Sequence, residues 1–138
     1  MYSTISKTLH TNRTLESSFD LVNLAREGLP KISVNSLIEV LEISIEEAVT
    51  LLPVSRRTLE RYEENQKLSL ELSDRLIQIA KVYSRTLEVF GDRNFTLRWL
   101  KSPCKAFGDT IPMSYLNVSS GFEIVMDELG RIDYGVYS

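Results

Sequence analysis

Helix start and stop signals constrain this sequence more than any other feature. The spacing Ser44-x-x-Glu47 predicts a capping box, in which the serine and glutamate side chains satisfy backbone N–H groups in the first turn of a helix. Pro53 ends the helix that follows, and Ser55 is placed to cap the next one. The sequence therefore predicts two short helices, over residues 45–52 and 55–64, joined by a tight turn.

Further signals of the same kind divide the rest of the chain. Gly28 and Pro30 form a helix stop, and Gly91 ends a long amphipathic run that Ser69 is placed to cap. Ser120-x-x-Glu123 repeats the capping-box spacing. The chain has no convincing β alternation and no internal repeat, so an all-α fold is predicted. The additional helices are expected over residues 17–27, 33–41, 69–90, 92–102 and 120–129.

Changes in residue composition and apolar periodicity along the chain predict three segments. Residues 1–16 are rich in Ser and Thr and have no sustained apolar period, which predicts a flexible N-terminal tail. Residues 17–67 form a helix-turn-helix region, and residues 68–138 form a second, largely helical domain. In the first helix, the amphipathic pattern consists of Phe19, Val22, Leu24 and Ala25, and Ser33 is the expected N-cap of the second.

Several function classes are disfavoured by what the chain lacks. Cys104 and His10 are its only cysteine and histidine, so it can form neither an intrachain disulfide nor a thiolate metal cluster. The chain also lacks a glycine-rich phosphate loop and a paired nucleophile and base, which predicts a binding protein with no enzymatic activity, metal or cofactor. It has no signal-peptide pattern and no apolar run of membrane-spanning length, so we expect a cytoplasmic protein without a membrane partner.

The two short helices at the centre have the layout of a helix-turn-helix. In that motif the second helix offers its N-terminal side chains to the DNA major groove. Here the guanidiniums could reach guanine or phosphate, and the hydroxyls could bond to phosphate. The candidate DNA-contacting residues are Ser55, Arg56, Arg57, Thr58 and Arg61.

An alternative interpretation of the same residues is a solvated charged face. The three arginines could pair with Glu60, Glu63 and Glu64, and charged helix faces are common. The net charge of −3 means that the chain as a whole does not attract phosphate, so any contact with nucleic acid depends on a local patch. Pattern alone leaves both interpretations open.

A family resemblance bears on this choice. It is carried by motifs whose order and spacing matter more than any single fragment. They are Ser55-Arg-Arg-Thr-Leu-Glu-Arg, Leu68-Ser, Ser73-Asp-Arg-Leu, Glu88-Val-Phe-Gly-Asp, Trp99-Leu-Lys-Ser-Pro, Gly108, Pro112 and Gly135-Val-Tyr-Ser. With these motifs the chain resembles the Xre/MbcA/ParS-type antitoxins, which join an Xre-like helix-turn-helix to a C-terminal toxin-binding domain.

The resemblance implies a function and its partners. It implies an antitoxin of a type II toxin–antitoxin system that neutralises a RES-domain toxin, an enzyme that depletes NAD, and that represses its own operon by binding operator DNA. Thr86 and the run Tyr62-Glu63-Glu64 depart from the alanine and extra arginine of many relatives, which implies a lower or differently specified operator affinity. Asp109 stands where a glycine is familiar, so the conformation of that loop is open.

The end of the chain is unusually apolar for a terminus. Apolar residues at a chain end need to be covered, either by their own domain or by a partner, and both arrangements are possible. Because the family resemblance puts this region near the mouth of the toxin's active site, we expect it to cover that site. Trp99, by contrast, is expected in the core. The candidate toxin-contacting residues are Arg131, Asp133, Tyr134, Val136, Tyr137 and Ser138.

Two functions from different classes therefore remain open at this stage. The first is an antitoxin that binds both toxin and operator. The second is a protein-only adaptor whose helix-turn-helix is a scaffold that does not bind DNA. A palindromic operator requires two-fold symmetry in its ligand, so the first function also predicts a homodimer.

Overall fold

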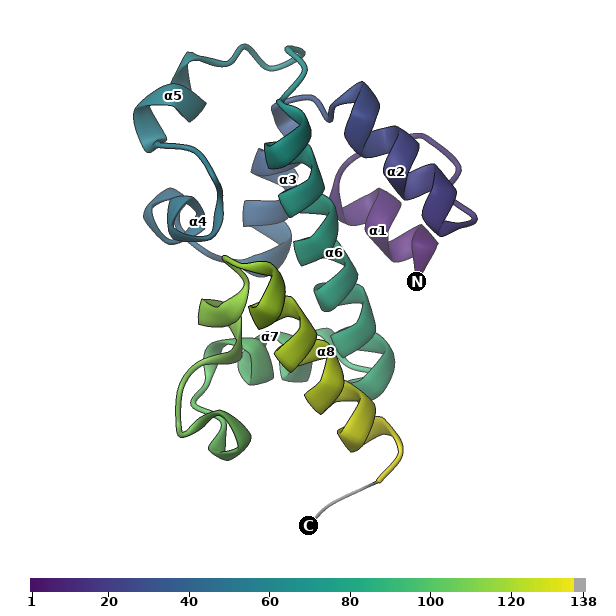
Figure 1. Cartoon of the computed structure of the whole chain (residues 1–138), viewed down its shortest axis with the longest axis vertical. Coiled ribbons are helices and arrows are strands. Elements are labelled where there is room, and N and C mark those ends of the chain that lie inside the picture. Colours follow the sequence, from purple (N-terminus) through teal and green to yellow (C-terminus); the bar gives the residue numbers. More distant parts are fainter. Residues whose placement is uncertain (136–138) are drawn as a thin grey trace. The chain divides into compact units, whose positions relative to one another are not determined.

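Helices make up nearly all the regular structure of residues 1–135, which are the residues that the computed structural model describes. This confirms the all-α prediction. Within the described residues, strand-like pairing is limited to two isolated bridges, Pro30 with Lys67 and Cys104 with Thr110. The elements, labelled in Figure 1, are α1 (Tyr2–Thr8), α2 (Ser18–Glu27), α3 (Ile32–Leu41), α4 (Ile45–Leu51), α5 (Arg56–Arg61), α6 (Leu70–Phe90), α7 (Arg93–Lys101), the 3₁₀ turns η1 (Lys105–Phe107) and η2 (Pro112–Tyr115), and α8 (Ser119–Asp133).

The chain divides into two compact units, Met1–Lys81 and Val82–Ser138, and the division lies inside α6. The predicted boundary, between residues 67 and 68, differs from this because the first half of α6 is tied to the helices before it. The Ser73 hydroxyl accepts a hydrogen bond from the Leu29 backbone N–H at 2.9 Å, and an Arg75 guanidinium nitrogen donates to the Leu51 carbonyl at 2.5 Å.

The N-terminus differs from the predicted flexible tail. Residues 2–8 form α1, which contacts α3, and the side chains of Ile5 and Leu9 are completely buried. The Ser33 hydroxyl donates to the Leu9 carbonyl at 2.6 Å, which ties the end of this segment to α3. Ile5 and Leu9, four positions apart, form one apolar patch on the helix. Two residues are too few to show a helical repeat in the sequence, so the pattern alone could not predict α1.

Some local predictions for the first unit are confirmed and others are wrong. Ser44 caps α4: its hydroxyl accepts a hydrogen bond from the Glu47 backbone N–H, and its own backbone N–H donates to the Glu47 carboxylate, as the capping box requires. Ser55 caps α5 and Ser69 caps α6. Ser33 is not an N-cap, because α3 begins one residue earlier. The apolar face of α2 is also displaced: Leu21, Leu24 and Ala25 are buried, whereas Phe19 and Val22 are exposed.

The second unit packs the end of α6, α7, the two 3₁₀ turns and α8 around its own core. Asp92 caps α7, as predicted, by accepting a hydrogen bond from the Phe95 backbone N–H at 3.1 Å. The capping box predicted at Ser120 is wrong, because α8 begins at Ser119 without a side-chain cap. The helix also continues through Gly130 to Asp133. Its buried residues are Gly121, Phe122, Val125, Glu128 and Leu129.

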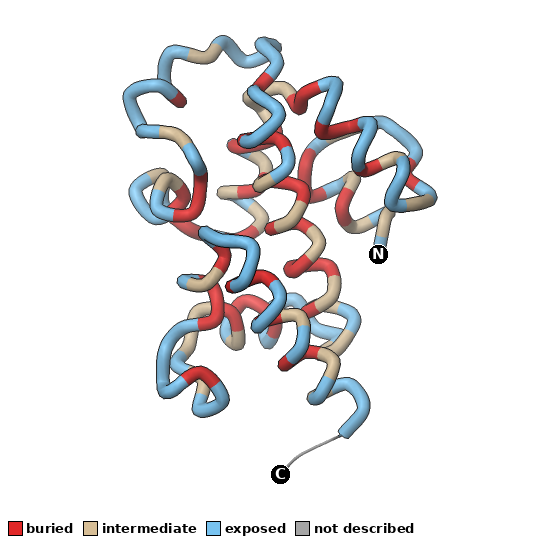
Figure 2. The backbone as a smooth tube through the Cα atoms, in the orientation of Figure 1, coloured by how far each residue is buried: buried red, intermediate tan, exposed pale blue. Residues whose placement is uncertain are grey.

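The position of α8 depends on a close backbone approach. A Cβ atom added to Gly121 would lie 1.8 Å from the Tyr115 carbonyl oxygen, so only glycine allows η2 and α8 to meet here. Burial is densest along the middle of α6, whereas α5 is almost entirely exposed (Figure 2). Among the described residues, no helix combines the length and apolar character that a membrane span requires.

Candidate functional site

Two short capped helices in the first unit form the predicted helix-turn-helix. α4 ends at Leu51, the chain is extended at Leu52, and α5 begins after the Ser55 cap. The Leu59 side chain is 2% exposed and anchors α5, whose other residues are all exposed (Figure 2). Because only one of its side chains is buried, the N-terminal side chains of α5 are open to a partner, which is the part of a recognition helix that contacts base edges.

Arg56, the first residue of α5, is held by carboxylates from two helices. Its Nε donates to Glu60 at 2.9 Å, one turn along α5, and its Nη1 is paired with Glu46 on α4. The hydrogen bonds that Arg56 donates, first to Glu60 and then to Glu46, raise the pKa of the Arg56 guanidinium. A backbone hydrogen bond and the side-chain hydrogen bond from Arg56 lower the pKa of Glu46. Both pKa shifts favour the charged forms of Arg56 and Glu46.

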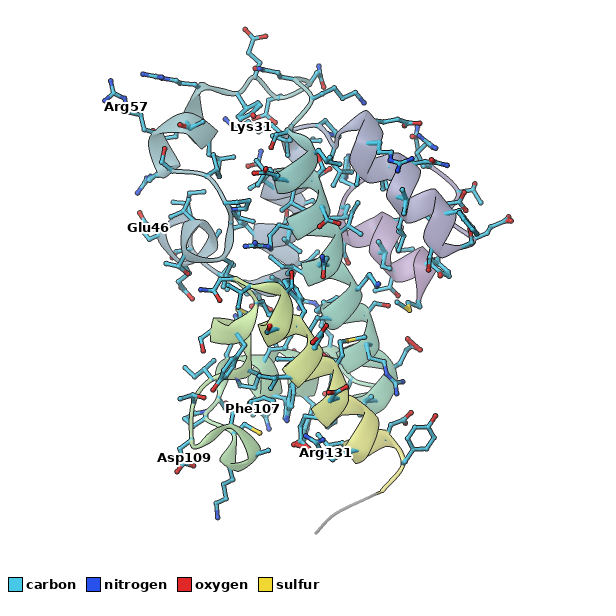
Figure 3. The ribbon with its side chains drawn as sticks, in the orientation of Figure 1. Lys31, Glu46, Arg57, Phe107, Asp109 and Arg131 are labelled. Carbon is cyan, nitrogen blue, oxygen red and sulfur yellow. The ribbon has the colours of Figure 1, made fainter. Side chains whose placement is uncertain are left out.

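The other candidate DNA-contacting residues differ from Arg56. The Thr58 backbone N–H donates to the Ser55 hydroxyl at 3.1 Å, and the two hydroxyls lie 3.0 Å apart. Arg57 and Arg61 are exposed and form no ion pair with any described residue. Figure 3 shows Arg57 projecting away from the ribbon. All five residues are exposed on α5 or at its N-cap, and two of the three arginines on this surface lack a carboxylate partner among the described residues.

This surface is not basic as a whole. Residues 45–64 contain three arginines and five glutamates, which gives a formal charge of −2. Beside it, the Lys31 ammonium donates to the Tyr62 carbonyl at 2.8 Å, and the Asn35 amide lies within 3.4 Å of the Glu64 carboxylate. The summed field of this surface does not attract phosphate, so a contact with DNA would depend on individual arginines.

Of the predicted toxin-contacting residues, Arg131, Asp133 and Tyr134 are described by the structure, and they lie at the end of α8. Both charged members have partners within the unit: Arg131 pairs with Glu128 at 3.2 Å, and Asp133 pairs with Arg85 of α6 at 2.9 Å. Tyr134 follows the helix and is 81% exposed. The remaining predicted residues, Val136, Tyr137 and Ser138, lie outside the described residues.

A row of aromatic rings is a feature of this unit that the sequence did not reveal. Trp99, which was expected in the core, is only partly buried, and its ring lies 5.7 Å from Phe90 and 6.4 Å from Phe107. Phe95, 4.9 Å from Phe90, is 45% exposed and has the Arg98 guanidinium 5.7 Å above its ring. Rings from three elements meet here, so no spacing within one helix could have identified the row.

Comparison with known proteins finds two families along the chain. Residues 20–81 match the family described as the antitoxin Xre-like helix-turn-helix domain. Residues 86–135 match the family described as the antitoxin Xre/MbcA/ParS C-terminal toxin-binding domain. The first match contains α4 and α5, and the second contains the aromatic row, α8 and Tyr134.

Curated relatives of the chain carry one name. Proteins named "Antitoxin Xre" are 29% identical over 85 residues in Yersinia enterocolitica, 32% identical over 73 residues in Photorhabdus laumondii and 33% identical over 100 residues in Pseudomonas putida. The matches cover 61%, 52% and 67% of this chain, respectively. The chain spans only 57%, 49% and 63% of the lengths of these relatives. Since the two family matches follow each other over most of its length, the chain belongs to the Xre/MbcA/ParS antitoxin family.

Proposed function

We propose that this protein is the antitoxin of a toxin–antitoxin system, and that it binds its toxin through the second unit and operator DNA through the first. The observation that carries the proposal is the succession of a helix-turn-helix domain and a toxin-binding domain within one chain. The exposed α5 and the exposed end of α8 are the surfaces through which the two units would act.

The proposed toxin is a RES-domain enzyme that depletes NAD. The antitoxin would inhibit it by steric occlusion, with the C-terminal residues covering the mouth of the active site. The pair of Arg85 and Asp133 supports this role, because it holds the last turn of α8 from which the terminal residues extend. Tyr134, aromatic and 81% exposed, is the kind of side chain that anchors a protein interface.

An NAD assay with both proteins present tests the occlusion. Deleting residues 134–138 should leave the toxin active, so NAD falls as it does with toxin alone. The matched control is Arg57→Ala with Arg61→Ala, which changes only the first unit and should still protect NAD. Complete protection by the truncated chain would exclude occlusion by the terminal residues.

Operator binding is the second part of the proposed function. DNA from upstream of the gene should give a mobility shift with the protein, and Arg57→Ala with Arg61→Ala should abolish it, because these are the arginines without carboxylate partners. The two-fold symmetry of a palindromic operator requires a homodimer, which light scattering of the purified protein would detect.

A protein-only adaptor is the competing function, and one observation favours it. The formal charge of −2 over residues 45–64 works against phosphate binding. An adaptor would protect NAD but give no shift with upstream DNA at any salt concentration. The two assays together therefore separate the two functions.

A further inference from the structure

Arg56 differs from its neighbours in being bound by two carboxylates from different helices. Glu60 lies on the same helix at the i+4 position, where an ion pair is common. Glu46 is ten residues away in sequence and reaches Arg56 across the turn between α4 and α5. One guanidinium therefore connects the two helices of the helix-turn-helix at their exposed surface.

The charges of this cluster oppose a contact with DNA. Two carboxylates and one guanidinium leave a formal charge of −1 at the start of α5. For Arg56 to bind a phosphate, it would have to leave both carboxylates, and these would then lie unpaired beside the polyanion. Like charges brought together at an interface reduce affinity, so exchanging two carboxylates for one phosphate is unfavourable.

We propose that Glu46 and Glu60 hold Arg56 away from DNA, so that Arg56 sets the relative orientation of α4 and α5 while Arg57 and Arg61 make the phosphate contacts. The two glutamates then lower the affinity of the protein for operator DNA. This inference rests on the proposed operator binding. It assigns positioning to one arginine of the motif and contact to the other two.

The exposure of the three side chains makes the cluster suitable for substitution. The Arg56, Glu46 and Glu60 side chains are 49%, 64% and 60% exposed, and exposed ion pairs contribute little to folding stability. Glu46→Gln and Glu60→Gln keep the size of each side chain and remove one charge. Circular dichroism should show unchanged helix content for both variants.

The test measures the affinity for upstream DNA as a function of salt concentration. Glu46→Gln should raise the affinity about threefold to tenfold, because one repulsive charge is lost and Arg56 is partly released. If the released arginine reaches a phosphate, the slope of log affinity against log salt concentration steepens by about 0.9 for each new contact. Glu60→Gln should act in the same direction, and the double variant should exceed either one.

Glu63→Gln is the matched control. It removes one exposed negative charge just after α5, and Glu63 has no side-chain contact with Arg56. Its effect on affinity should be smaller than that of Glu46→Gln and should not depend on Arg56. In an Arg56→Gln background, the effect of Glu46→Gln should fall to about that of Glu63→Gln, because only the loss of one negative charge then remains.

The alternatives give different results. If Glu46→Gln lowers affinity, the carboxylate helps Arg56 to contact DNA, and the proposal is overturned. Equal gains from Glu46→Gln and Glu63→Gln would also overturn it, since net charge alone would then explain the effect. If the wild-type protein shifts upstream DNA and Glu46→Gln has the same affinity, this inference is refuted. The proposed operator binding would still hold. If no variant shifts upstream DNA, the proposed operator binding fails and this inference fails with it.

Discussion

Two regions of this chain, the helix-turn-helix and α8, are positioned by different kinds of interaction. The helix-turn-helix is delimited by caps that act within three residues, at Ser44 and Ser55. The position of α8 depends on the contact between Gly121 and the Tyr115 backbone, which belongs to a different element. Local signals thus decide where a helix begins and ends along the chain, whereas backbone contacts between elements decide which way its surface faces.

The largest expected effect comes from breaking the backbone approach. Gly121→Ala puts a Cβ 1.8 Å from a carbonyl oxygen, so η2 and α8 must separate. We expect the second unit to lose about 3 kcal/mol or more of its stability. Hydrogen exchange should show the loss in α8, and NAD protection in the toxin assay should fall with it.

Gly130→Ala is the control for this substitution, in the same helix. Nothing lies within 4 Å of a Cβ added there, and alanine favours helix over glycine, so stability should rise by about 0.5–1 kcal/mol. If Gly121→Ala were as well tolerated as Gly130→Ala, the second unit would not depend on this approach, and the contrast between the two regions would fail.

Substituting two serines tests how much a local helix cap contributes to stability. Ser44→Ala removes the hydrogen bond that the Ser44 hydroxyl accepts from the Glu47 backbone N–H, and should cost about 1 kcal/mol. Ser120 has the same sequence spacing to Glu123 but caps nothing, so Ser120→Ala should change stability by less than about 0.5 kcal/mol. Chemical denaturation of both variants measures the difference. Similar losses would mean that the Ser120 side chain stabilises α8 in some other way.

These serines also show how far the sequence could predict the molecule. The spacing of serine and glutamate identified α4 and its cap, because a capping box is a contact between near neighbours. The same spacing at Ser120 failed, because α8 begins one residue earlier, after Val118. No signal within three or four residues could report the Tyr115 contact that fixes this helix.

The candidate DNA-reading surface has the same division between local and distant contacts. The i+4 spacing of Glu60 from Arg56 is visible in the sequence, and the charged-face interpretation included it. Glu46 lies across a turn, so its pairing with Arg56 required the angle between α4 and α5 to be known. The sequence could identify the three arginines but could not predict which of them have carboxylate partners.

A smaller effect is expected from the ion pair that connects α6 and α8 within the second unit. Asp133 lies at the C-terminal end of α8, where the helix dipole disfavours a negative charge, and Arg85 offsets this at 2.9 Å. Because both side chains are partly exposed, Arg85→Ala should cost only about 0.5 kcal/mol. The loss should be confined to faster hydrogen exchange in the last turn of α8.

Exchanging the two charges isolates this interaction. Arg85→Asp alone puts two carboxylates together and should increase exchange further than Arg85→Ala does. Adding Asp133→Arg restores an ion pair and should return exchange toward the wild-type rate. If the effects of the two substitutions on hydrogen exchange simply add and the exchange rate does not recover, the ion pair does not hold the end of the helix.

The smallest expected effect concerns the loop that contains Asp109, where the sequence resemblance leads us to expect a glycine. Asp109 has a φ of 64°, directly after Gly108 at 63°, so the aspartate keeps a left-handed conformation that glycine adopts more easily. Figure 3 shows it on the outside of its loop. Asp109→Gly should therefore stabilise the second unit by about 0.5 kcal/mol, because relief of the strain exceeds the added freedom of the unfolded chain. Asp109→Ala, which adds no flexibility and lacks the tolerance of aspartate for this conformation, should destabilise it slightly. A loss of stability with glycine would mean that the carboxylate contributes more than its backbone conformation costs, and thermal unfolding of the two variants decides between these signs.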